Sequence, residues 1–314
     1  MTDGHTKERL KELQALPLER KVGFTAARIT EAYNRWGGRC YVSFSGGKDS
    51  TVLLHIARSL FPDIKAVYID TGLEYPEIKE FVKGFDNVDI IRPKKTFVQV
   101  IEERGYPIIS KEVSQAVCEL RREIRNNRVG CRHEQFGLAF ISGKYTNRYS
   151  FSKYAHLKDA PFKISHQCCN IMKKAPSKDY TKQTGMYPII ATMACESRLR
   201  KTNWVRHGCN AFDSKNPHSA PMSFWTEQDV LKYIQLNEIP IASVYGDITE
   251  EGNKLKCTGC SRTGCVFCAF GAHLEKSPNR FQRLKETHPK LWEYCINGKL
   301  NMKQVLDYIG VPYE

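Results

Sequence analysis

Short apolar runs and helical stretches alternate along residues 40–93, and this alternation constrains the fold more than any other feature of the sequence. Strands are predicted at CYVSFS (40–45), KAVYIDTG (65–72) and VDIIRP (88–93), and helices at STVLLHIARSL (50–60) and near 76–85. Strands that alternate with helices form a parallel sheet, because the connection between two parallel strands has to cross over the sheet. The expected fold class is α/β, with a doubly wound, mostly parallel sheet that binds ligands at the carboxyl ends of its strands.

The segment SFSGGKDST (43–51) lies between a predicted strand and a predicted helix. Gly46 and Gly47 let the backbone turn so that its N–H groups point inward, the helix that starts near Ser50 adds its partial positive end, and Lys48 adds a mobile charge. Such a loop is expected to bind a polyphosphate. It is not the Walker pattern, which needs Gly, four residues and then Gly-Lys-Ser/Thr. A plain strand-to-helix turn is the alternative.

The composition is that of a folded protein with several regions. Hydrophobic residues at 41% and charged residues at 26% exclude disorder as the main theme. We expect an N-terminal helical segment (1–38), a nucleotide-binding α/β domain with a basic middle segment (39–215) and a smaller helical C-terminal lobe with a Cys-rich loop (216–314). No apolar run approaches the ~20 residues that span a bilayer, and the polar N-terminus lacks the apolar region of a signal peptide. The expectation is a cytoplasmic protein without a membrane partner.

Close pairs among the 12 cysteines indicate metal binding or redox chemistry rather than disulfides, because thiols stay reduced in the cytosol. Two groups stand out, Cys168-Cys169 in SHQCCNIMKKAP, and Cys257, Cys260, Cys265 and Cys268 in CTGCSRTGCVFC. Each Cys-x2-Cys pair directs two thiolates to one point and forms half of a zinc or iron–sulfur site. The four local cysteines could close a site, although only four residues separate their two pairs. Small buried side chains are expected at Cys40, Cys118 and Cys195, whereas Cys209 and Cys295 stay undecided.

Positive charge is concentrated in the middle of the chain. The whole sequence has 48 Lys+Arg against 34 Asp+Glu, and residues 104–215 hold 21 of these cations but only 8 of the acids. A helical stretch (110–128) is followed there by aromatics among cations, namely Phe136, Tyr145, Arg148, Tyr149, Lys153, Tyr154 and Lys158. Because cations attract phosphates and aromatic rings stack on unpaired bases, a nucleic-acid partner is predicted. A solvated helix face with ordinary core aromatics explains the pattern equally well.

The letters SGGKDS match the signature of the PP-loop ATP pyrophosphatases, which this loop therefore resembles. The resemblance implies that ATP, with Mg²⁺, is split between its α and β phosphates, so that a substrate is adenylated and pyrophosphate leaves. It implies that Asp70, in IDTG, lies by the nucleotide, and that Lys48, Asp49 and Ser50 are catalytic. The phosphates would be held by Ser45, Gly46, Gly47, Lys48, Asp49, Ser50 and Thr51.

A wider resemblance, over about residues 38–300, is to the phosphoadenosine phosphosulfate reductase family in its broad sense. Adjacent cysteines before Lys-Lys-x-Pro, with a later Gly-Cys-x2-Cys, are similar to the pattern by which adenylylsulfate reductases hold a [4Fe–4S] cluster. This similarity favours Cys168, Cys169, Cys265 and Cys268 as ligands, with a local zinc site that includes Cys257 and Cys260 as the alternative. The stretch 185–204 resembles the family's second substrate segment. There Glu196, Ser197, Arg198 and Arg200 would face the nucleotide or an anionic group, although structural salt bridges would also account for them. Anion binding is also expected at Lys173 and Lys174 of the Lys-Lys-x-Pro run.

Two departures from the sulfonucleotide reductases favour ATP cleavage. Those enzymes carry a catalytic cysteine in a Glu-Cys-Gly-x-His tail, whereas the sequence ends in DYIGVPYE, and their phosphate loop is degenerate, whereas Lys48-Asp49 is intact here. The leading hypothesis is an enzyme that adenylates an acceptor, with nucleic acid as the expected acceptor, for sulfur incorporation from a sulfur donor protein. The second is a thiol-dependent adenylylsulfate or phosphoadenylylsulfate reductase that uses Cys295 or Cys209 and produces sulfite. The third is a non-catalytic nucleic-acid-binding or nucleotide-sensing protein.

Overall fold

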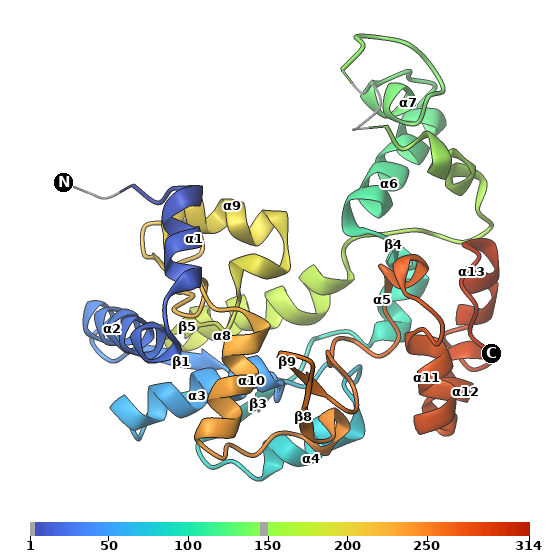
Figure 1. The fold of residues 1–314 in the computed structure, drawn as a ribbon. Coiled ribbons are helices and arrows are strands. Elements are labelled where there is room, and N and C mark those ends of the chain that lie inside the picture. Colours follow the sequence, from blue (N-terminus) through green and yellow to red (C-terminus); the bar gives the residue numbers. More distant parts are fainter. Residues whose placement is uncertain (1–3, 145–149) are drawn as a thin grey trace. The chain divides into compact units, whose positions relative to one another are not determined.

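The computed structural model describes residues 4–144 and 150–314 and groups the chain into two compact units (Figure 1). Unit 1 contains Met1–Asp70, Glu74–Pro93 and Ala175–Thr263. Unit 2 contains Thr71–Leu73, Lys94–Lys174 and Gly264–Glu314. The division near residues 38 and 215 expected from the sequence stays a prediction. No helix in the described ranges is both long enough and apolar enough to cross a membrane.

Unit 1 is built on a six-stranded sheet with the order β3-β2-β1-β5-β7-β6. Its strands are β1 (Cys40–Ser43), β2 (Lys65–Ile69), β3 (Val88–Ile91), β5 (Tyr187–Ile189), β6 (Asn210–Ala211) and β7 (His218–Ser219). All neighbouring strands run parallel except β6, which runs antiparallel to β7. The predicted α/β fold with a mostly parallel sheet is confirmed. Both β1 and β2 end two to three residues earlier than the sequence predicts, so Ser45 and Asp70 follow the strands directly.

Helices surround this sheet in unit 1. They are α1 (Lys7–Ala15), α2 (Leu18–Arg35), α3 (Lys48–Leu60), α4 (Pro76–Lys83), α8 (Ala175–Thr184), α9 (Arg198–His207) and α10 (Glu227–Leu236). Pro17 separates α1 from α2 and stands at the N-cap of α2. The buried face of α2 reaches α10, because Lys21 Nζ donates to Asp229 Oδ2 at 2.7 Å. An antiparallel hairpin of β8 (Ile248–Glu251) and β9 (Lys254–Cys257) follows α10.

Unit 2 joins the middle of the sequence to its last part. Its helices are α5 (Phe97–Arg104), α6 (Lys111–Arg125), α7 (Cys131–Gln135), α11 (Arg280–Thr287), α12 (Pro289–Ile296) and α13 (Met302–Tyr308), with short turns at η2 (Ser152–Asp159), η3 (Asn170–Lys174) and η6 (Ala272–Leu274). The join is a parallel pair of two-residue strands, β4 (Ile108–Ile109) and β10 (Ala269–Phe270).

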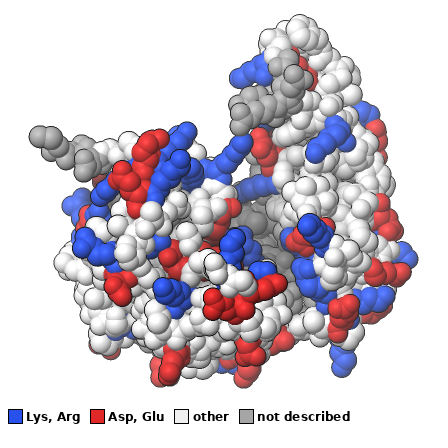
Figure 2. Space-filling model, in the orientation of Figure 1, with Lys and Arg blue, Asp and Glu red and all other residues white. Residues whose placement is uncertain are grey.

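The cations of the basic middle segment divide between structural and exposed positions. Arg121 donates to four backbone carbonyl oxygens between Leu157 and Phe162 at 2.7–2.9 Å, so it fixes η2 to α6. Phe136 is buried and packs edge-on against Phe151, so the expectation that it stacks on bases is wrong. Tyr145, Arg148 and Tyr149 lie outside the described residues. Other Lys and Arg side chains reach the surface, as Figure 2 shows for one face.

Candidate active site and cysteine pocket

The glycine-rich loop connects β1 to α3 in unit 1. Gly46 adopts φ +71°, and a Cβ at this position would lie 2.8 Å from both Ile78 Cγ2 and Val82 Cγ2 of α4. Only glycine therefore fits, both for its backbone angle and for the space available. Helix α3 begins at Lys48, two residues earlier than predicted, with Gly47 as its N-cap. Lys48, Asp49 and Ser50 thus occupy the first turn, where the helix dipole favours an anion.

Hydroxyl groups hold the loop in one conformation. Ser50 Oγ lies 3.0 Å from Ser45 Oγ and 3.1 Å from the Ser45 backbone nitrogen, and it donates to Gly47 O at 2.9 Å. Thr51 Oγ1 also donates to Gly47 O, at 3.1 Å. Ser50 and Thr51 are buried, whereas Ser45 is exposed at the mouth of the loop. The loop is therefore ordered by its own side chains.

Lys48 is held by residues from the last third of unit 1. Its side chain is buried, and Nζ donates to Ser261 O at 2.8 Å and lies 3.2 Å from Glu227 Oε1. Its backbone N–H donates to Tyr245 Oη at 3.2 Å, and this phenol is 2.6 Å from Thr263 Oγ1. Burial alone would lower the pKa of Lys48, but Asp49, Tyr245 and Glu227 together raise it above its ordinary value. Lys48 therefore stays a cation.

Asp49 carries a carboxylate oxygen that lacks a hydrogen bond. Oδ1 is buried, has no hydrogen-bond partner among residues 4–144 and 150–314, and lies 3.9 Å from Lys48 Nζ. Burial raises the pKa of this carboxyl, although the positive charges of Lys48, Arg262 and Arg200 oppose the shift. A buried carboxylate oxygen of this kind is a suitable ligand for a divalent cation, because Mg²⁺ prefers hard oxygen ligands.

A second group of charges lies in electrostatic reach of Asp49. Glu196, at the end of the turn η4 (Ala194–Glu196), pairs with Arg200 of α9 and lies 3.6 Å from Arg262 Nη2. Burial and the charge of Arg262 lower the pKa of Arg200. Ser197 caps α9 by accepting a hydrogen bond from the Arg200 backbone at 3.3 Å, whereas Arg198 is exposed. Glu196 and Arg200 thus share a structural ion pair, and the two guanidinium groups together form a positive site.

The strand β2 delivers Asp70 to the same sheet edge as the loop. Its two carboxylate oxygens are engaged by Lys79 Nζ at 2.7 Å and Arg92 Nε at 3.2 Å. Two cations therefore occupy the carboxylate that the family resemblance assigns to the nucleotide. Its proximity to a nucleotide stays a prediction.

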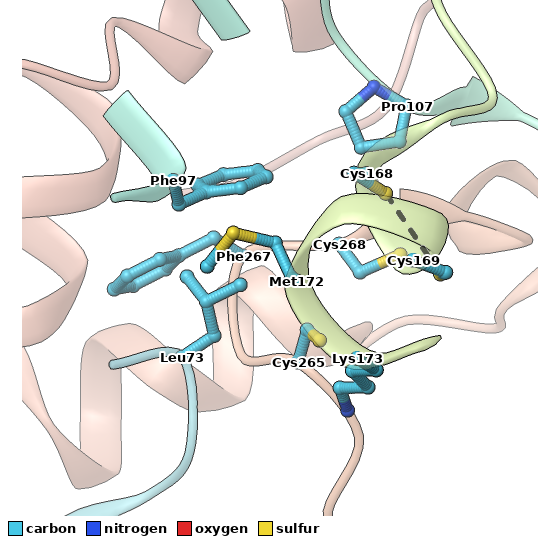
Figure 3. Close-up of a pocket in the computed structure, with 10 residues that line it drawn as sticks. All are labelled: Leu73, Phe97, Pro107, Cys168, Cys169, Met172, Lys173, Cys265, Phe267 and Cys268. Carbon is cyan, nitrogen blue, oxygen red and sulfur yellow. Dashed lines mark hydrogen bonds between the residues drawn. The ribbon is translucent and has the colours of Figure 1, made fainter. Parts of the chain in front are cut away.

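Four of the predicted metal ligands line one pocket in unit 2 (Figure 3). Its empty volume is about 330 Å³, and Cys168, Cys169, Cys265 and Cys268 lie around it. The remaining lining is apolar apart from one cation, and consists of Leu73, Phe97, Pro107, Met172, Phe267 and Lys173. Cys168 and Cys169 begin the turn that continues into η3, with their sulfur atoms 3.8 Å apart. The structure thus brings together the two cysteine pairs that lie almost one hundred residues apart in sequence.

The surroundings of these thiols favour a thiolate at one of them. A hydrogen bond with Cys168, followed by the charges of Lys173, Lys111 and Lys174, lowers the pKa of Cys169. Burial raises the pKa of Cys268 to about 11. No three His, Cys, Asp or Glu side chains in the described parts of the chain converge as one metal ion requires. A four-iron cluster needs one thiolate on each iron, so its ligands surround a larger body.

The other cysteines fall elsewhere. Cys257 and Cys260 belong to unit 1. Burial raises the pKa of Cys257, and the charges of Glu227 and Asp49 add to this shift, whereas that of Lys48 opposes it. Cys209 and Cys295 are both buried, and burial raises the pKa of each thiol. Cys40 is buried as predicted, and Cys118 is half-buried. The prediction for Cys195 is wrong, because it is exposed in η4, with Arg262 and Asp49 in electrostatic reach.

Sequence reasoning missed Tyr245, Glu227 and Arg262. No local motif marks Tyr245 or Glu227, since each meets Lys48 from about two hundred residues away. Arg262 could have been found, because it is a cation between the two cysteine pairs of CTGCSRTGCVFC, but that segment was interpreted only as a source of metal ligands.

The family model for the phosphoadenosine phosphosulfate reductase domain matches residues 39–129 and 132–270. The chain belongs to this family. One curated relative is the uncharacterized protein MJ0973 of Methanocaldococcus jannaschii. It is 24% identical over 263 residues, which cover 81% of this chain and 46% of the relative. Another is the adenosine 5'-phosphosulfate reductase of Chelativorans sp. (strain BNC1), 30% identical over 122 residues, which cover 35% of this chain and 49% of the enzyme. The chain spans about half the length of these relatives.

Among solved structures, one that resembles this chain is a reductase of the same family. The phosphoadenylyl-sulfate reductase from Candida auris, in a phosphate complex, aligns with a TM-score of 0.36 and 13% identity over 79% of this chain and 97% of that chain.

Proposed function

We propose that this member of the phosphoadenosine phosphosulfate reductase family cleaves ATP to AMP and pyrophosphate and adenylates an acceptor for sulfur incorporation. The observation that carries the proposal is the phosphate loop, in which the buried Lys48 ammonium stands beside an Asp49 oxygen without a hydrogen bond. A family member that only bound a sulfonucleotide would need no such pair, because its substrate has no pyrophosphate to release.

The roles of the loop residues follow from their positions. The first turn of α3 and the N–H groups around Gly46 and Gly47 would hold the β and γ phosphates. Lys48 would neutralise charge on the leaving pyrophosphate, and Asp49 Oδ1 would bind the Mg²⁺ of the nucleotide. Ser50 orders the loop rather than attacking a phosphate, because its hydroxyl is engaged with Ser45 and Gly47. Catalysis would rest on positioning and electrostatics.

The chemical step is a displacement on phosphorus followed by one on the acceptor. An acceptor oxygen attacks the α-phosphorus, the bond between the α-phosphorus and the bridging oxygen breaks, and pyrophosphate leaves. A reduced sulfur atom from a donor then displaces AMP, so that the acceptor exchanges an oxygen for a sulfur. Arg200 and Arg262 would hold the anionic group that is transferred, since guanidinium groups contact phosphates in a bidentate way.

The cysteine pocket fits an iron–sulfur cluster. Four thiols from two chain segments line it, its other walls are apolar, and the pKa of Cys169 is lowered, which favours the thiolate that a metal binds. Cys168, Cys169, Cys265 and Cys268 would hold a [4Fe–4S] cluster, which would carry sulfur or orient the acceptor. Lys173 lines the same pocket, and its charge would balance the anionic thiolates.

Product analysis tests the proposal. Protein loaded with ATP, Mg²⁺ and a mixture of cellular RNA or DNA is expected to release AMP and pyrophosphate, and Lys48→Ala is expected to lose about 10²- to 10³-fold of this activity. Lys290→Ala is the matched control, because this exposed lysine of α12 lies in unit 2, outside the phosphate loop. Release of ADP and inorganic phosphate would contradict the proposal.

A thiol-dependent sulfonucleotide reductase is the second candidate. The partial similarity to the Chelativorans reductase favours it, and it predicts sulfite from adenylylsulfate or phosphoadenylylsulfate. The thiols that the sequence suggested as its nucleophiles, Cys209 and Cys295, are buried with raised pKa values. An accessible thiolate is needed for attack on sulfur, so this observation favours ATP cleavage.

A non-catalytic protein that binds nucleic acid or senses nucleotide is the third candidate. It predicts salt-dependent binding without turnover, and Lys48→Ala would leave its function intact. The same product analysis separates it from the first candidate, because it predicts neither pyrophosphate nor sulfite.

A further inference from the structure

Exposed apolar side chains are concentrated in one part of unit 2. Among the eleven large hydrophobic residues that are exposed in the described ranges, five lie within residues 124–141, namely Ile124, Val129, Leu138, Phe140 and Ile141. Phe140 is 84% exposed, the highest value of the eleven. We call residues 119–144 the α6–α7 segment, since they contain the end of α6 and all of α7. Isolated exposed hydrophobics are ordinary, but a local concentration marks an interaction surface.

Internal hydrogen bonds fix this segment rather than leaving it as a loose loop. The carboxylate of Glu134 accepts from the Ser142 backbone at 2.8 Å and from Ser142 Oγ at 2.9 Å, and also from the Gly143 backbone. Glu123 Oε2 lies 2.8 Å from His133 Nδ1, and a Cβ on Gly130 would meet the Glu123 carboxylate. The turn that presents Phe140 and Ile141 is therefore anchored to α7, and α7 to α6.

The unpaired charge at the surface of the α6–α7 segment is positive. Its three acids are all engaged within the segment, because Glu119 pairs with Arg132, Glu123 with His133, and Glu134 with the turn at 141–143. Arg122, Arg125 and Arg128 are exposed, and the described residues supply none of them with an ion pair. Arg122 and Arg125 stand three residues apart on α6, so they share a face of the helix.

We propose that the α6–α7 segment docks an unpaired stretch of a polynucleotide, with Arg122, Arg125 and Arg128 on phosphates and Phe140 stacked on a base. The inference deepens the proposed function, since it identifies the surface that would bind the acceptor. Aromatic rings stack on any unpaired base, and cations beside them follow the backbone, which is the combination that single-strand binding uses. An acidic or purely apolar protein partner would use only one of the two properties. RNA and DNA share this chemistry, and the experiment separates them.

The test is direct binding without ATP. The whole protein is titrated into fluorescently labelled single-stranded RNA and, separately, single-stranded DNA of mixed sequence, over a series of salt concentrations. The triple change Arg122→Ala, Arg125→Ala and Arg128→Ala is expected to weaken binding and to reduce the slope of log affinity against log salt by about 2. Phe140→Ala is expected to weaken binding about tenfold or more while leaving the slope unchanged. The nucleic acid that binds more tightly is the one the surface serves.

Matched controls come from the same unit. Lys290→Ala, Lys299→Ala and Lys303→Ala together remove the same charge from exposed positions around α12 and α13, and Leu274→Ala removes another exposed apolar side chain. Both controls are expected to bind like the unchanged protein. The inference is overturned if the controls and the α6–α7 variants lose binding equally, or if the unchanged protein binds neither nucleic acid. Binding by a protein that releases no pyrophosphate would count against the proposed function alone, whereas pyrophosphate release without binding would count against this inference alone.

Discussion

The phenol oxygen of Tyr245 lies 3.2 Å from the backbone nitrogen of Lys48, although 197 residues separate them in sequence. The phenol also meets Thr263 Oγ1, so one hydroxyl links the phosphate loop to the segment that follows the β8–β9 hairpin. The first turn of α3 is therefore braced from outside as well as by its own serines.

Tyr245→Phe is expected to lower the free energy of unfolding by about 1–3 kcal/mol, because it leaves the buried N–H of Lys48 without an acceptor. Urea denaturation followed by circular dichroism measures the change. Tyr294→Phe is the control, since Tyr294 is partly exposed on α12. If Tyr245→Phe unfolds at the same urea concentration as the control, the phenol does not brace the loop.

Asp49 is expected to make Mg²⁺-nucleotide binding sensitive to pH. Burial raises the pKa of this carboxyl, so it takes up a proton at a higher pH than an exposed aspartate, whose pKa is about 3.9. Since the cation needs the carboxylate, binding should weaken as the pH falls through the raised pKa of Asp49. For the free protein the sign is opposite, because a raised carboxyl pKa means that folding stability decreases as the pH rises.

Asp49→Asn tests both effects by calorimetric titration with ATP and Mg²⁺. The variant is expected to bind weakly at every pH and to lose the Mg²⁺ dependence, while its folding stability at neutral pH is retained or increased. Binding by the unchanged protein that does not weaken in acid would contradict the role given to Asp49.

Serine substitutions identify the metal ligands. Cys168→Ser, Cys169→Ser, Cys265→Ser and Cys268→Ser are each expected to reduce the iron and sulfide content of anaerobically purified protein, because each removes one ligand from the pocket. Cys257→Ser and Cys260→Ser are the controls and should leave iron unchanged. A protein that contains zinc without iron, and that loses it in these two controls, would instead support the local four-cysteine site.

Glu134 is expected to hold the turn at residues 141–143 only while it is ionised. Burial opposes ionisation, but the hydrogen bonds from Ser142, Gly143 and Ile141 are stronger together and lower the pKa of this carboxyl. A lowered carboxyl pKa contributes stability above the unfolded pKa, and this stability is lost as the pH falls through the folded pKa.

Hydrogen exchange measures this effect at the amides of Ile141, Ser142 and Gly143. Glu134→Gln should speed their exchange at neutral pH, and the unchanged protein should approach the variant in acid. Glu286→Gln, on the exposed side of α11, is the control and should leave these amides protected. Equal protection in Glu134→Gln and the unchanged protein would remove Glu134 as the anchor.

Local patterns predicted three of the six strands of the central sheet, and the loop. The strands β1, β2 and β3 are short apolar runs, which can be recognised from the sequence of each strand alone. The glycines and Lys48 lie in one uninterrupted motif. The cysteine pocket was reached only through a family resemblance, because nothing between Cys169 and Cys265 indicates that they meet. The roles of Tyr245 and Glu227 could not be predicted from the sequence, since their contacts with Lys48 depend on the path of the chain through the whole of unit 1.

That residues 94–174 and 264–314 form one unit could not be predicted from the sequence, for a related reason. Its two longer segments are joined by β4 and β10, and strands of two residues are too short to show an alternating pattern in sequence. The exposure of Cys195 was missed because a free thiol is usually buried, whereas here it lies in η4 with charged groups in electrostatic reach.

The pairing of Ile108 with Ala269 and of Ile109 with Phe270 has a consequence for how the protein is made. During translation Cys168 and Cys169 leave the ribosome long before Cys265 and Cys268 are synthesised. Until β10 has emerged and reached β4, a nascent chain would offer the proposed cluster only two of its four thiols. Assembly of the proposed cluster would therefore follow translation of residue 270, and a chain stalled before that point would carry Cys168 and Cys169 alone.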